Sequence, residues 1–398
     1  MRFWGITGTN GKTTTTWITA AFINAAKDRK CGYVTTVEVD TGTRQFYTGY
    51  TTPPLKQLKE IFAEMEANGC TDCVMEVSSH AIHQHRTGDT VFSGGVFTNL
   101  SEDHLDYHKT MEAYFDVKLD FARQIAAAHP TTPDMGRRDL PPYVVCLDGG
   151  YGREMFNAVG NLAVNVIGVS AGETGTRRTS GTSRTQPAYD LSRLQLAGDY
   201  NKSNVLCAAA LAEAAGVPHD VIQAVIPTLK PRWGRLEEVK LEGRGKREEG
   251  RGMPRAFVDF AHTPDGLEKV LAAARGFTPE GKKLWVVFGA GGDRDPMKRP
   301  LMGEACAKLA DRLVVTSDNP RSEDPGAIID AILGGIGGDR RQSTVVEPDR
   351  KKAIEFALRE AGEGDVVIIA GKGHETTQEI KGVKYPFDDR EVVRAFRR

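Results

Sequence analysis

The sequence lacks a strong charge imbalance, a long apolar run and an obvious export signal. Its 52 basic and 53 acidic side chains give a formal net charge of −1, which argues against a nucleic-acid binder, because such proteins usually carry a basic excess. No apolar run approaches the ~20 residues that a membrane span needs. Lys12 and a glycine-rich stretch interrupt the N-terminal residues, so they do not form a signal peptide. We therefore expect neither a nucleic-acid partner nor a membrane partner.

The sequence also has few cysteines, and they do not form a recognisable framework. Only Cys70 and Cys73 of the six are close together, as C-x-x-C, and no second pair completes a zinc site. Histidines 80, 83, 85, 104 and 108 have suggestive spacings. They lack cysteine partners or a paired second half, so we interpret the spacing as chance. Reduced thiols in a cytoplasmic enzyme are the better interpretation.

The chain shows no repeat of fixed period, and its 398 residues exceed what one hydrophobic core usually supports. Apolar, β-rich runs alternate with helical patterns, which predicts an α/β protein with parallel sheets and covering helices. In the first part we predict strands at 2–6, 73–77, 94–97, 143–147 and 164–169, and helices at 12–26, 54–68, 111–128 and 201–215. In the second part we predict strands at 236–242, 255–260, 284–288, 312–316 and 365–369, and helices at 264–275, 298–310, 325–333 and 349–361. A Gly/Arg-rich turn joins the first two of these later strands.

Two segments interrupt the alternation. Residues 171–190 are rich in Gly, Ser, Thr and Arg, which predicts a mobile surface loop. Residues 227–235, "PTLKPRWGR", contain two prolines and a glycine and are typical of a hinge that closes the first unit. The pattern restarts after this hinge as a second, smaller α/β unit.

The segment "GTNGKT", Gly8 to Thr13, follows a short strand and opens a helix. In such a loop the backbone N–H groups bind an anion, the lysine contacts the outer phosphates and the threonine hydroxyl ligates Mg²⁺. The match is imperfect, because Ile6 stands where the standard pattern has its first glycine. We still predict a nucleotide-binding loop rather than an ordinary turn before a helix.

Polar side chains follow two other predicted strands. "VMEVSSH" places Glu76 at a strand end, and "FTNLSEDHLDYH" places Asn99 and His104 after the next strand. Ligands bind beyond the carboxyl ends of strands in open parallel sheets, so we predict that Glu76 and His104 meet around Mg²⁺ near Lys12. Taken singly, a strand-end cap and a loop histidine would explain these two residues. Lys118, by periodicity alone, is an ordinary solvated lysine.

These segments resemble the Mur ligases, ATP-dependent amide-forming enzymes of cell-wall precursor synthesis. The matching stretches run in family order across nearly the whole chain: "GITGTNGKTT", "TTP", "MEVSSHAIHQHR", "FTNLSEDHLDYHKTMEAYFDVK", "GDYNKSN", "GRLEEV", "VDFAHTPDGLE", "FGAGGDRDPMKRPLMG", "TSDNPRSEDP", "AGKGHE" and "FDDRE". The resemblance implies a P-loop-type central ATP-binding domain with a mostly parallel sheet over 1–234. It also implies a Rossmann-like C-terminal domain that binds the amino acid over 235–398.

The resemblance also implies roles for individual residues. ATP contacts fall on Gly8, Thr9, Asn10, Gly11, Lys12, Thr13, Thr14, Asn99, Asn204, Arg235, Asp259 and His262. Two Mg²⁺ ions fall on Thr13, Glu76, His104 and Lys118, and Lys118 matches a lysine that the family carries as a carbamate, which reverses our interpretation of it as a surface lysine. Lys12, Glu76, His104 and Lys118 form the catalytic set. Acceptor contacts fall on Thr51, Thr52, Ser78, Gln84 and Arg86.

The amine donor is indicated by "DNPR", residues 318–321, which resembles the form associated with meso-diaminopimelate. Arg321 offers a guanidinium fork that suits a distal carboxylate, and the remaining positions of that pocket match Arg294, Asn319, Gly371 and Glu375. Asn-Pro also favours a simple turn, but the nearby "GGDR" and "GKGHE" favour the pocket. We expect a diamino acid to be joined through an acyl phosphate to a UDP-N-acetylmuramoyl dipeptide.

Family members usually carry an N-terminal domain that binds the uridine nucleotide of the acceptor, and Met1 falls where the central domain begins. Three explanations are open: a truncated chain, a separate UDP-binding polypeptide, or an acceptor without UDP. Two other functions also stay open. One is a ligase acting on a non-nucleotide acceptor, as in folylpolyglutamate synthesis or a natural-product pathway, and the other is a non-catalytic partner subunit. We expect a monomer with small-molecule substrates.

Overall fold

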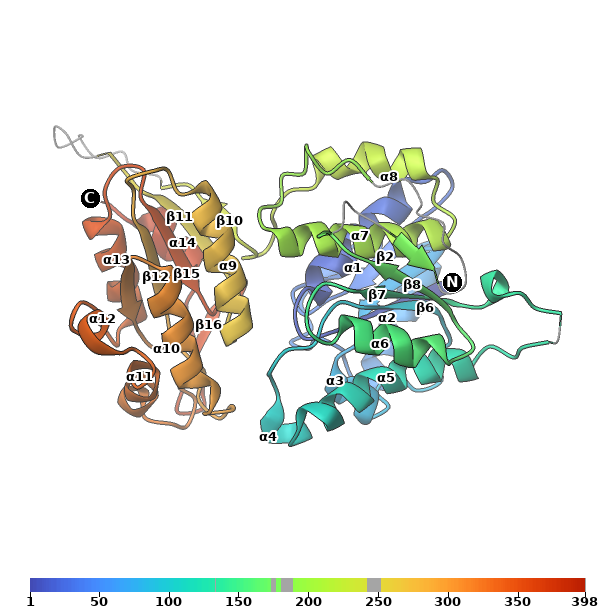
Figure 1. Cartoon of the computed structure of the whole chain (residues 1–398), viewed down its shortest axis with the longest axis horizontal. Coiled ribbons are helices and arrows are strands. Elements are labelled where there is room, and N and C mark those ends of the chain that lie inside the picture. The colour runs from blue at the N-terminus through green and yellow to red at the C-terminus, as the bar shows by residue number, and fades with distance from the viewer. Residues whose placement is uncertain (133, 173–176, 180–188, 242–251, 398) are drawn as a thin grey trace. The chain divides into compact units, whose positions relative to one another are not determined.

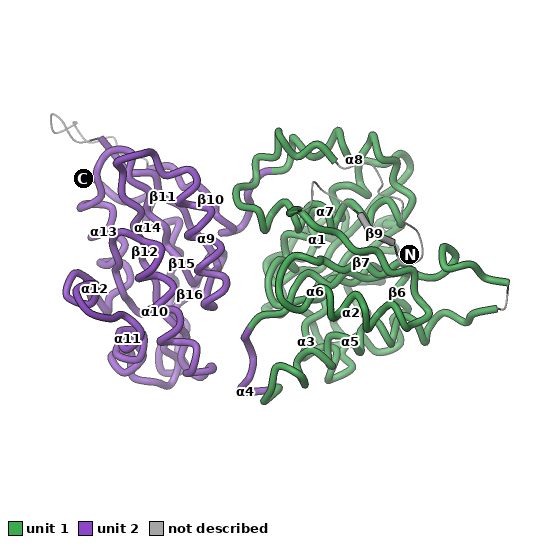
Figure 2. Tube along the Cα trace, viewed as in Figure 1, with its two compact units in different colours: residues 1–101, 108–229 green, residues 102–107, 230–398 purple. Residues whose placement is uncertain are grey.

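The computed structural model describes residues 1–132, 134–172, 177–179, 189–241 and 252–397. They form two compact units, one made of residues 1–101 and 108–229 and the other of residues 102–107 and 230–398 (Figure 2). The second unit thus begins inside the segment 227–235, and the short segment 102–107 groups with it. The functional domains 1–234 and 235–398 stay a prediction.

The first unit is built on a sheet whose described strands run in the order β4-β3-β2-β5-β1-β6-β7-β8-β9. The strands are β1 (Arg2–Thr7), β2 (Cys31–Val34), β3 (Val39–Asp40), β4 (Gln45–Phe46), β5 (Asp72–Glu76), β6 (Phe92–Phe97), β7 (Pro142–Cys146), β8 (Asn165–Val169) and β9 (Arg177–Thr179). The six central strands pair in parallel, in the order β2-β5-β1-β6-β7-β8. Strands β3, β4 and β9 add antiparallel pairings at the two edges. The parallel centre brings several strand ends to one edge.

Helices cover both faces of this sheet (Figure 1). One face shares a hydrophobic core with α2 (Leu55–Ala67), α5 (Met111–Ala127) and α6 (Gly152–Gly160). Helices α1 (Lys12–Ala25), α7 (Asp199–Ala214) and α8 (His219–Val225) contact one another over the other face. The short helices are α3 (Ser79–His83), α4 (Leu105–His108), η1 (Arg137–Asp139) and η2 (Ile226–Thr228).

The second unit has a smaller sheet with described strands in the order β10-β11-β15-β12-β13-β14. Its strands are β10 (Glu237–Val239), β11 (Arg255–Asp259), β12 (Leu284–Phe288), β13 (Arg312–Val315), β14 (Val345–Val346) and β15 (Val366–Ala370), with a separate hairpin of β16 (Thr377–Ile380) and β17 (Val383–Pro386). Only the pairing of β10 with β11 is antiparallel within this described sheet. Its core therefore also has the parallel architecture that the sequence predicts.

Two groups of helices cover the second sheet (Figure 1). Helices α9 (Pro264–Phe277), α10 (Lys298–Leu309) and α11 (Pro325–Leu333) lie side by side. Helices α13 (Arg350–Glu360) and α14 (Asp389–Ala395) pack with the opposite hydrophobic cluster, and α12 (Gly338–Gln342) is a short connector. None of the described helices combines the length and the apolar character that a membrane span requires.

The predicted elements are all present, with ends that differ by three residues or fewer. Three predictions need correction or fall outside the described residues. The predicted strand 236–242 is shorter, Glu237–Val239, and most of the Gly/Arg-rich turn, 242–251, lies outside the described residues. The predicted loop 171–190 is wrong over Arg177–Thr179, because these residues pair with β8 as β9. The rest of that loop, 173–176 and 180–188, is not described.

Candidate active site

The loop between β1 and α1 requires two glycines. Gly8 has φ +146° and Gly11 has φ +84°. A Cβ at Gly8 would lie 1.9 Å from Thr98 Oγ1, and one at Gly11 would lie 2.4 Å from Asn204 Oδ1. Gly11 is also the N-cap of α1 and brings no side chain that could occupy the N–H groups of the first turn. Such a helix N-terminus favours an anion.

The departure from the standard phosphate-loop pattern has a structural reason. Ile6 lies inside β1, where it is fully buried and paired with Glu76 of β5. The turn therefore begins only at Gly8, and an apolar side chain at position 6 belongs to the core of the sheet. The first glycine of the pattern is not needed for this loop geometry.

The segment that follows β6 holds the phosphate loop in place. Asn99 Oδ1 accepts from the N–H of Asn10 at 2.9 Å, and Asn99 Nδ2 donates back to the Asn10 carbonyl at 3.0 Å. Thr98 Oγ1 donates to the same carbonyl at 2.7 Å. Because three bonds meet at one loop residue, the β6 end fixes the loop before any ligand binds. Asn99 thus has a positioning geometry in addition to its predicted ATP contact.

Lys12, Thr13 and Thr14 open α1 at the mouth of this loop. The Lys12 ammonium donates to the carbonyl oxygens of Gly8, at 3.0 Å, and Thr9, at 2.8 Å. Thr13 and Thr14 are buried. On the far side of the loop, Asn204 of α7 accepts from Thr15 Oγ1 at 3.4 Å. A lysine folded over its own loop and a helix N-terminus are the features that favour a polyphosphate ligand, and the nucleotide contacts of these residues stay a prediction.

Glu76 is a buried carboxylate with neutral hydrogen-bond donors. It is 1% exposed, and its two oxygens accept from the N–H and the hydroxyl of Thr36 at 2.8 and 3.0 Å. The Thr36 hydroxyl lies 3.0 Å from Thr51 Oγ1, which ties the predicted acceptor residue to the carboxylate. None of the ion pairs among the described residues involves Glu76. A buried negative charge without a basic partner suits a cation, since burying a lone charge is costly.

The predicted acceptor residues form one connected group. Thr52 Oγ1 donates to the Glu76 carbonyl at 2.8 Å and accepts from the N–H of Ser78 at 3.1 Å. Arg86 Nη1 donates to the Thr52 carbonyl at 3.4 Å, and Arg86 Nε donates to Gln84 Oε1 at 2.8 Å. Ser78 also caps α3 by accepting from Ala81 N. The structure therefore brings together all five residues that the sequence indicated for the acceptor.

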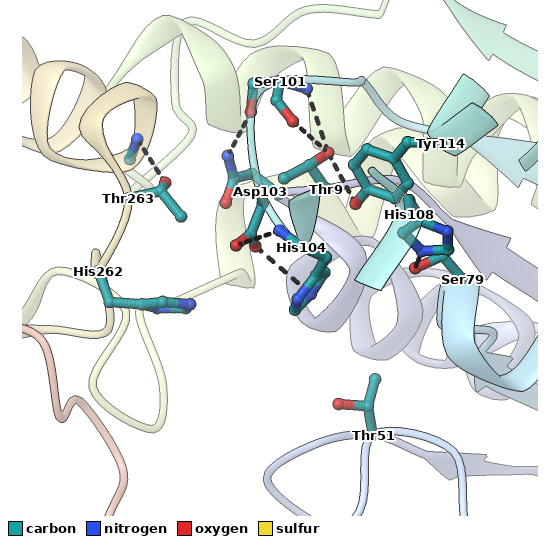
Figure 3. A network of polar contacts seen from close by, with 12 residues as sticks. Thr9, Thr51, Ser79, Ser101, Asp103, His104, His108, Tyr114, His262 and Thr263 are labelled. Atoms are coloured by element: carbon teal, nitrogen blue, oxygen red, sulfur yellow. Dashed lines mark hydrogen bonds and ion pairs between the residues drawn. The ribbon is translucent and has the colours of Figure 1, made fainter. Parts of the chain in front are cut away.

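Lys118 is 1% exposed, so the interpretation from periodicity as a solvated lysine is wrong. Its ammonium lies 4.7 Å from the ring centre of Tyr114, one turn earlier on α5. The Tyr114 hydroxyl lies 3.2 Å from Thr9 Oγ1 in the phosphate loop (Figure 3). Lys118 is thus linked to the nucleotide loop through Tyr114, and its carbamylation stays a prediction.

His104 has a left-handed backbone, φ +56°, and its Nε2 lies 3.5 Å from Asp103 Oδ2. It belongs to the segment 102–107 of the second compact unit, whereas Thr13, Glu76 and Lys118 belong to the first. Among the described residues there is no cluster of three or more His, Cys, Asp or Glu side chains that could hold a metal ion. A shared magnesium site for Thr13, Glu76, His104 and Lys118 therefore stays a prediction.

In the second unit, the three predicted nucleotide residues lie at the end of β11. The Asp259 carboxylate accepts from the N–H groups of Leu236, at 2.6 Å, and Ala261, at 2.7 Å. Burial raises the pKa of Asp259, and the nearby Arg235 only partly opposes this. Burial, helped by Lys298, lowers the pKa of His262. His262 Nδ1 lies 2.7 Å from the Phe260 carbonyl, which can only accept, so Nδ1 carries the proton and Nε2 keeps its lone pair.

The predicted amine-donor residues lie in the loops that follow β12, β13 and β15. Asn319 Nδ2 donates to Glu375 Oε2 at 2.8 Å. Arg321 Nη1 donates to the Gly292 carbonyl at 2.6 Å, and its backbone has φ +51°. Arg294 is exposed, and a Cβ at Gly291 would approach both its side chain and that of Arg321. The two predicted arginines thus flank the same loop.

A fully buried lysine, Lys372, joins two of these residues. Its ammonium donates to Asn319 Oδ1 at 3.1 Å and to Glu375 Oε2 at 2.9 Å. The glycines on either side of Lys372, Gly371 and Gly373, shape the loop. Gly371 has φ +118°, and a Cβ at Gly234 would lie 2.2 Å from the carbonyl carbon of Gly373. The loop 371–375 is therefore held against the residues that begin the second unit.

Sequence reasoning missed four residues of these networks: Thr36, Tyr114, Lys372, and His108, whose ring stacks on that of Tyr114. The missed strand β2 explains Thr36, because β2 pairs with β5 and brings residue 36 to the edge where Glu76 ends. The other three lie inside quoted family segments, "HLDYH", "EAYF" and "GKGHE", but their roles depend on contacts that sequence spacing does not reveal.

Comparisons with known proteins agree with this geometry. The family model described as "Mur ligase middle domain" matches residues 6–212, and the one described as "Mur ligase, glutamate ligase domain" matches residues 243–373. A Synechococcus elongatus protein named UDP-N-acetylmuramoyl-L-alanyl-D-glutamate–2,6-diaminopimelate ligase is 40% identical, and the match covers 98% of this chain and 75% of that protein.

Two solved structures are also similar. One, of a UDP-N-acetylmuramoyl-L-alanyl-D-glutamate–2,6-diaminopimelate ligase, is 31% identical with a TM-score of 0.58 and covers 99% of this chain and 77% of that one. Another, a folylpolyglutamate synthase from Mycobacterium tuberculosis, has a TM-score of 0.61 at 19% identity over 93% of this chain and 88% of that one. The second similarity shows a shared fold alone. The family models and the 40% identity together establish that this chain belongs to the Mur ligase family.

Proposed function

We propose that this protein is an ATP-dependent ligase that joins meso-diaminopimelate to a carboxyl group of UDP-N-acetylmuramoyl-L-alanyl-D-glutamate in peptidoglycan precursor synthesis. The observation that carries the proposal is the similarity, across 98% of the chain, to a relative named for this reaction. The phosphate loop and the Asn319–Glu375 cluster support it, because their side chains suit ATP and an amine, respectively.

The first step activates the acceptor, because a carboxylate is a poor electrophile. An oxygen of the acceptor carboxylate bonds to the γ-phosphorus of ATP, the bond to the ADP oxygen breaks, and an acyl phosphate results. Lys12 would exchange its contacts with the Gly8 and Thr9 carbonyls for phosphate oxygens. Its charge and the N–H groups at the start of α1 would stabilise the negative charge that develops on the transferred group.

The second step forms the amide. The neutral amine of the donor bonds to the acyl carbon, the carbon–oxygen bond to phosphate breaks, inorganic phosphate leaves and the new ammonium loses a proton. Asn319 and Arg321 would hold the distal carboxylate of the donor, and Glu375 would hold its distal ammonium. Lysine lacks that carboxylate, so its binding would leave the Arg321 fork without its partner.

Oxygen donors suit Mg²⁺, and the buried Glu76 carboxylate, which only neutral groups contact, fits a cation. We propose that Thr13 and Glu76, with His104 and a carbamate on Lys118, hold two Mg²⁺ ions. Bound Mg²⁺ neutralises charge on the phosphates as a Lewis acid. A carbamate would turn the buried Lys118 cation into an anion that suits such ions.

The proposal is tested by measuring phosphate release that depends on both ATP and amine. The acceptors are UDP-N-acetylmuramoyl-L-alanyl-D-glutamate and a folate-type acceptor, with mass spectrometry of the product. We expect turnover with the muramoyl acceptor and meso-diaminopimelate, and none in Lys12→Ala, whose circular dichroism should match wild type. Near-normal turnover in Lys12→Ala would rule out the nucleotide site. Product only with the folate-type acceptor would overturn the proposed acceptor.

The same assay addresses the partners. Activity of this chain alone on the nucleotide-linked acceptor would exclude the need for a separate UDP-binding polypeptide. We further propose a monomer that works in the cytoplasm. All six cysteines are free and buried, which agrees with a reducing compartment. Light scattering and cell fractionation test these two statements.

A further inference from the structure

Tyr114 stands at the centre of a contact network in the first unit (Figure 3). It is 1% exposed and lies in the first turn of α5. Its hydroxyl contacts the phosphate loop at Thr9, one face stacks on His108, and Lys118 lies over its ring. The mechanism described above assigns no role to this residue.

The Thr9 hydroxyl makes three hydrogen-bond contacts, one of them with Tyr114. Thr9 Oγ1 can donate to the Ser101 carbonyl, at 3.3 Å. It accepts from the Ser101 N–H at 3.1 Å. Its third contact, 3.2 Å to the Tyr114 hydroxyl, is a hydrogen bond in which either oxygen can be the donor. The Tyr114 hydroxyl therefore completes the hydrogen bonding of a phosphate-loop side chain.

His108 fixes the ring that carries this hydroxyl. The two rings stack with centroids 4.8 Å apart and planes 17° apart. His108 is buried, and its Nε2 lies 2.9 Å from the hydroxyl of Ser79, the first residue of α3. Stacking restricts the tilt of the Tyr114 ring, and the Ser79 bond restricts rotation of the imidazole. The hydroxyl thus reaches Thr9 from a ring held on more than one side.

We propose that Tyr114 is a positioning residue for nucleotide binding: its hydroxyl holds Thr9, and thereby the phosphate loop, in the conformation that binds the phosphates. The inference rests on the proposed use of ATP at this loop. His108 and Ser79 serve the same end by orienting the ring. Tyr114 itself contacts no substrate in this role.

The test is the affinity of the full chain for the nonhydrolysable ATP analogue AMPPCP with Mg²⁺, measured by calorimetry on wild type and Tyr114→Phe. Phenylalanine keeps the ring that His108 and Lys118 contact and removes only the hydroxyl. We expect Kd to rise about three- to tenfold, the range that one lost hydrogen bond gives. KM for ATP should rise in parallel, with a smaller change in kcat. An unchanged Kd would overturn the inference.

Tyr143→Phe is the matched control. Tyr143 is fully buried in the same hydrophobic cluster, and its hydroxyl has no hydrogen-bond partner among the described residues. Its removal should leave the Kd for AMPPCP unchanged. A rise equal to that in Tyr114→Phe would show that loss of any core hydroxyl has this effect and would overturn the inference.

A second measurement separates positioning from a general loss of packing. Thr9→Val removes the hydroxyl that Tyr114 contacts. If Tyr114 acts through Thr9, adding Tyr114→Phe to Thr9→Val should change Kd no further, whereas independent effects would multiply and contradict the inference. Wild-type binding of AMPPCP without amine-dependent turnover would refute the proposed ligase activity while leaving this test valid.

Discussion

Replacing Arg350 by methionine should strongly destabilise the second unit. Arg350 and Asp389 are both fully buried and form a two-pronged ion pair, with Nε–Oδ1 at 2.8 Å and Nη2–Oδ2 at 2.7 Å. Burial by itself would lower the pKa of the guanidinium, but Asp389 outweighs it and raises that pKa. Methionine has a similar length and no charge, so the buried Asp389 carboxylate would lose its basic partner.

The size of the effect follows from that unpaired charge. Breaking a buried pair by removing one partner costs about 3–5 kcal/mol, whereas replacing both partners by apolar residues is often nearly neutral. We therefore expect Arg350→Met to lower the free energy of unfolding of the second unit by about 3–5 kcal/mol. Arg350→Met combined with Asp389→Leu should recover most of this loss.

Urea unfolding followed by circular dichroism and tryptophan fluorescence measures the difference. The control is Arg255→Met, because Arg255 forms an equally two-pronged bond to Glu238 on the surface, at 2.8 and 3.1 Å. An exposed pair contributes about 0–1 kcal/mol. If Arg350→Met costs no more than the control, or if the double variant is no better than the single one, the reasoning from buried charge is wrong.

Three further outcomes are expected. Lys118→Ala should lose turnover and regain part of it with short-chain carboxylic acids that replace the carbamate; full activity without rescue would return Lys118 to a structural role. Wild type should prefer meso-diaminopimelate to L-lysine by roughly thirtyfold or more in kcat/KM, and Arg321→Ala should remove most of that preference; equal use by wild type would contradict the donor assignment. Burial, with help from Arg235, lowers the pKa of His374 to about 3, so the unfolded chain takes up this proton first as pH falls below about 6.5. The contribution of neutral His374 to the free energy of unfolding is therefore fully present above that pH and is lost as pH falls towards 3. In His374→Gln the free energy of unfolding, measured with urea, should fall by about 1–2 kcal/mol less than in wild type between pH 7.5 and pH 5. An equal fall in both proteins would refute this.

The buried strands and long helices were predictable, because each carries a continuous apolar run or a helical period. Helix α11, for example, has the bounds that the sequence predicts, since Asp324 caps it and Pro325 begins it. The four-residue strand β2 was missed because "CGYV" contains a glycine and is too short to give a pattern. The hairpin of β16 and β17 was missed because its residues are half-buried or exposed and lack an apolar face.

For the candidate site, the family resemblance indicated the residues, whose roles stay a prediction, but not their surroundings. The five acceptor residues were indicated by resemblance, and the structure adds the hydrogen bonds that join them. Lys118 shows the limit of periodicity. Its position on α5 suits a surface lysine, but the packing of that helix buries it. The packing of other elements against α5 decides the environment of Lys118. The spacing of apolar residues along this helix does not show that packing.

The close approach of Gly234 to Gly373 bears on which mutations the enzyme can accept. A side chain at position 234 would meet main-chain atoms, at 2.2 Å, which cannot rotate away as a flexible side chain would. The loop 371–375 would have to shift, and with it Lys372 and Glu375, which contact Asn319. Substitutions at Gly234 would therefore be tolerated or rejected according to how they change the proposed binding of the amine donor. A survey of donor preference should accordingly include position 234 among the determinants, although the segment that contains it, "GRLEEV", was indicated for the nucleotide and not for the amine.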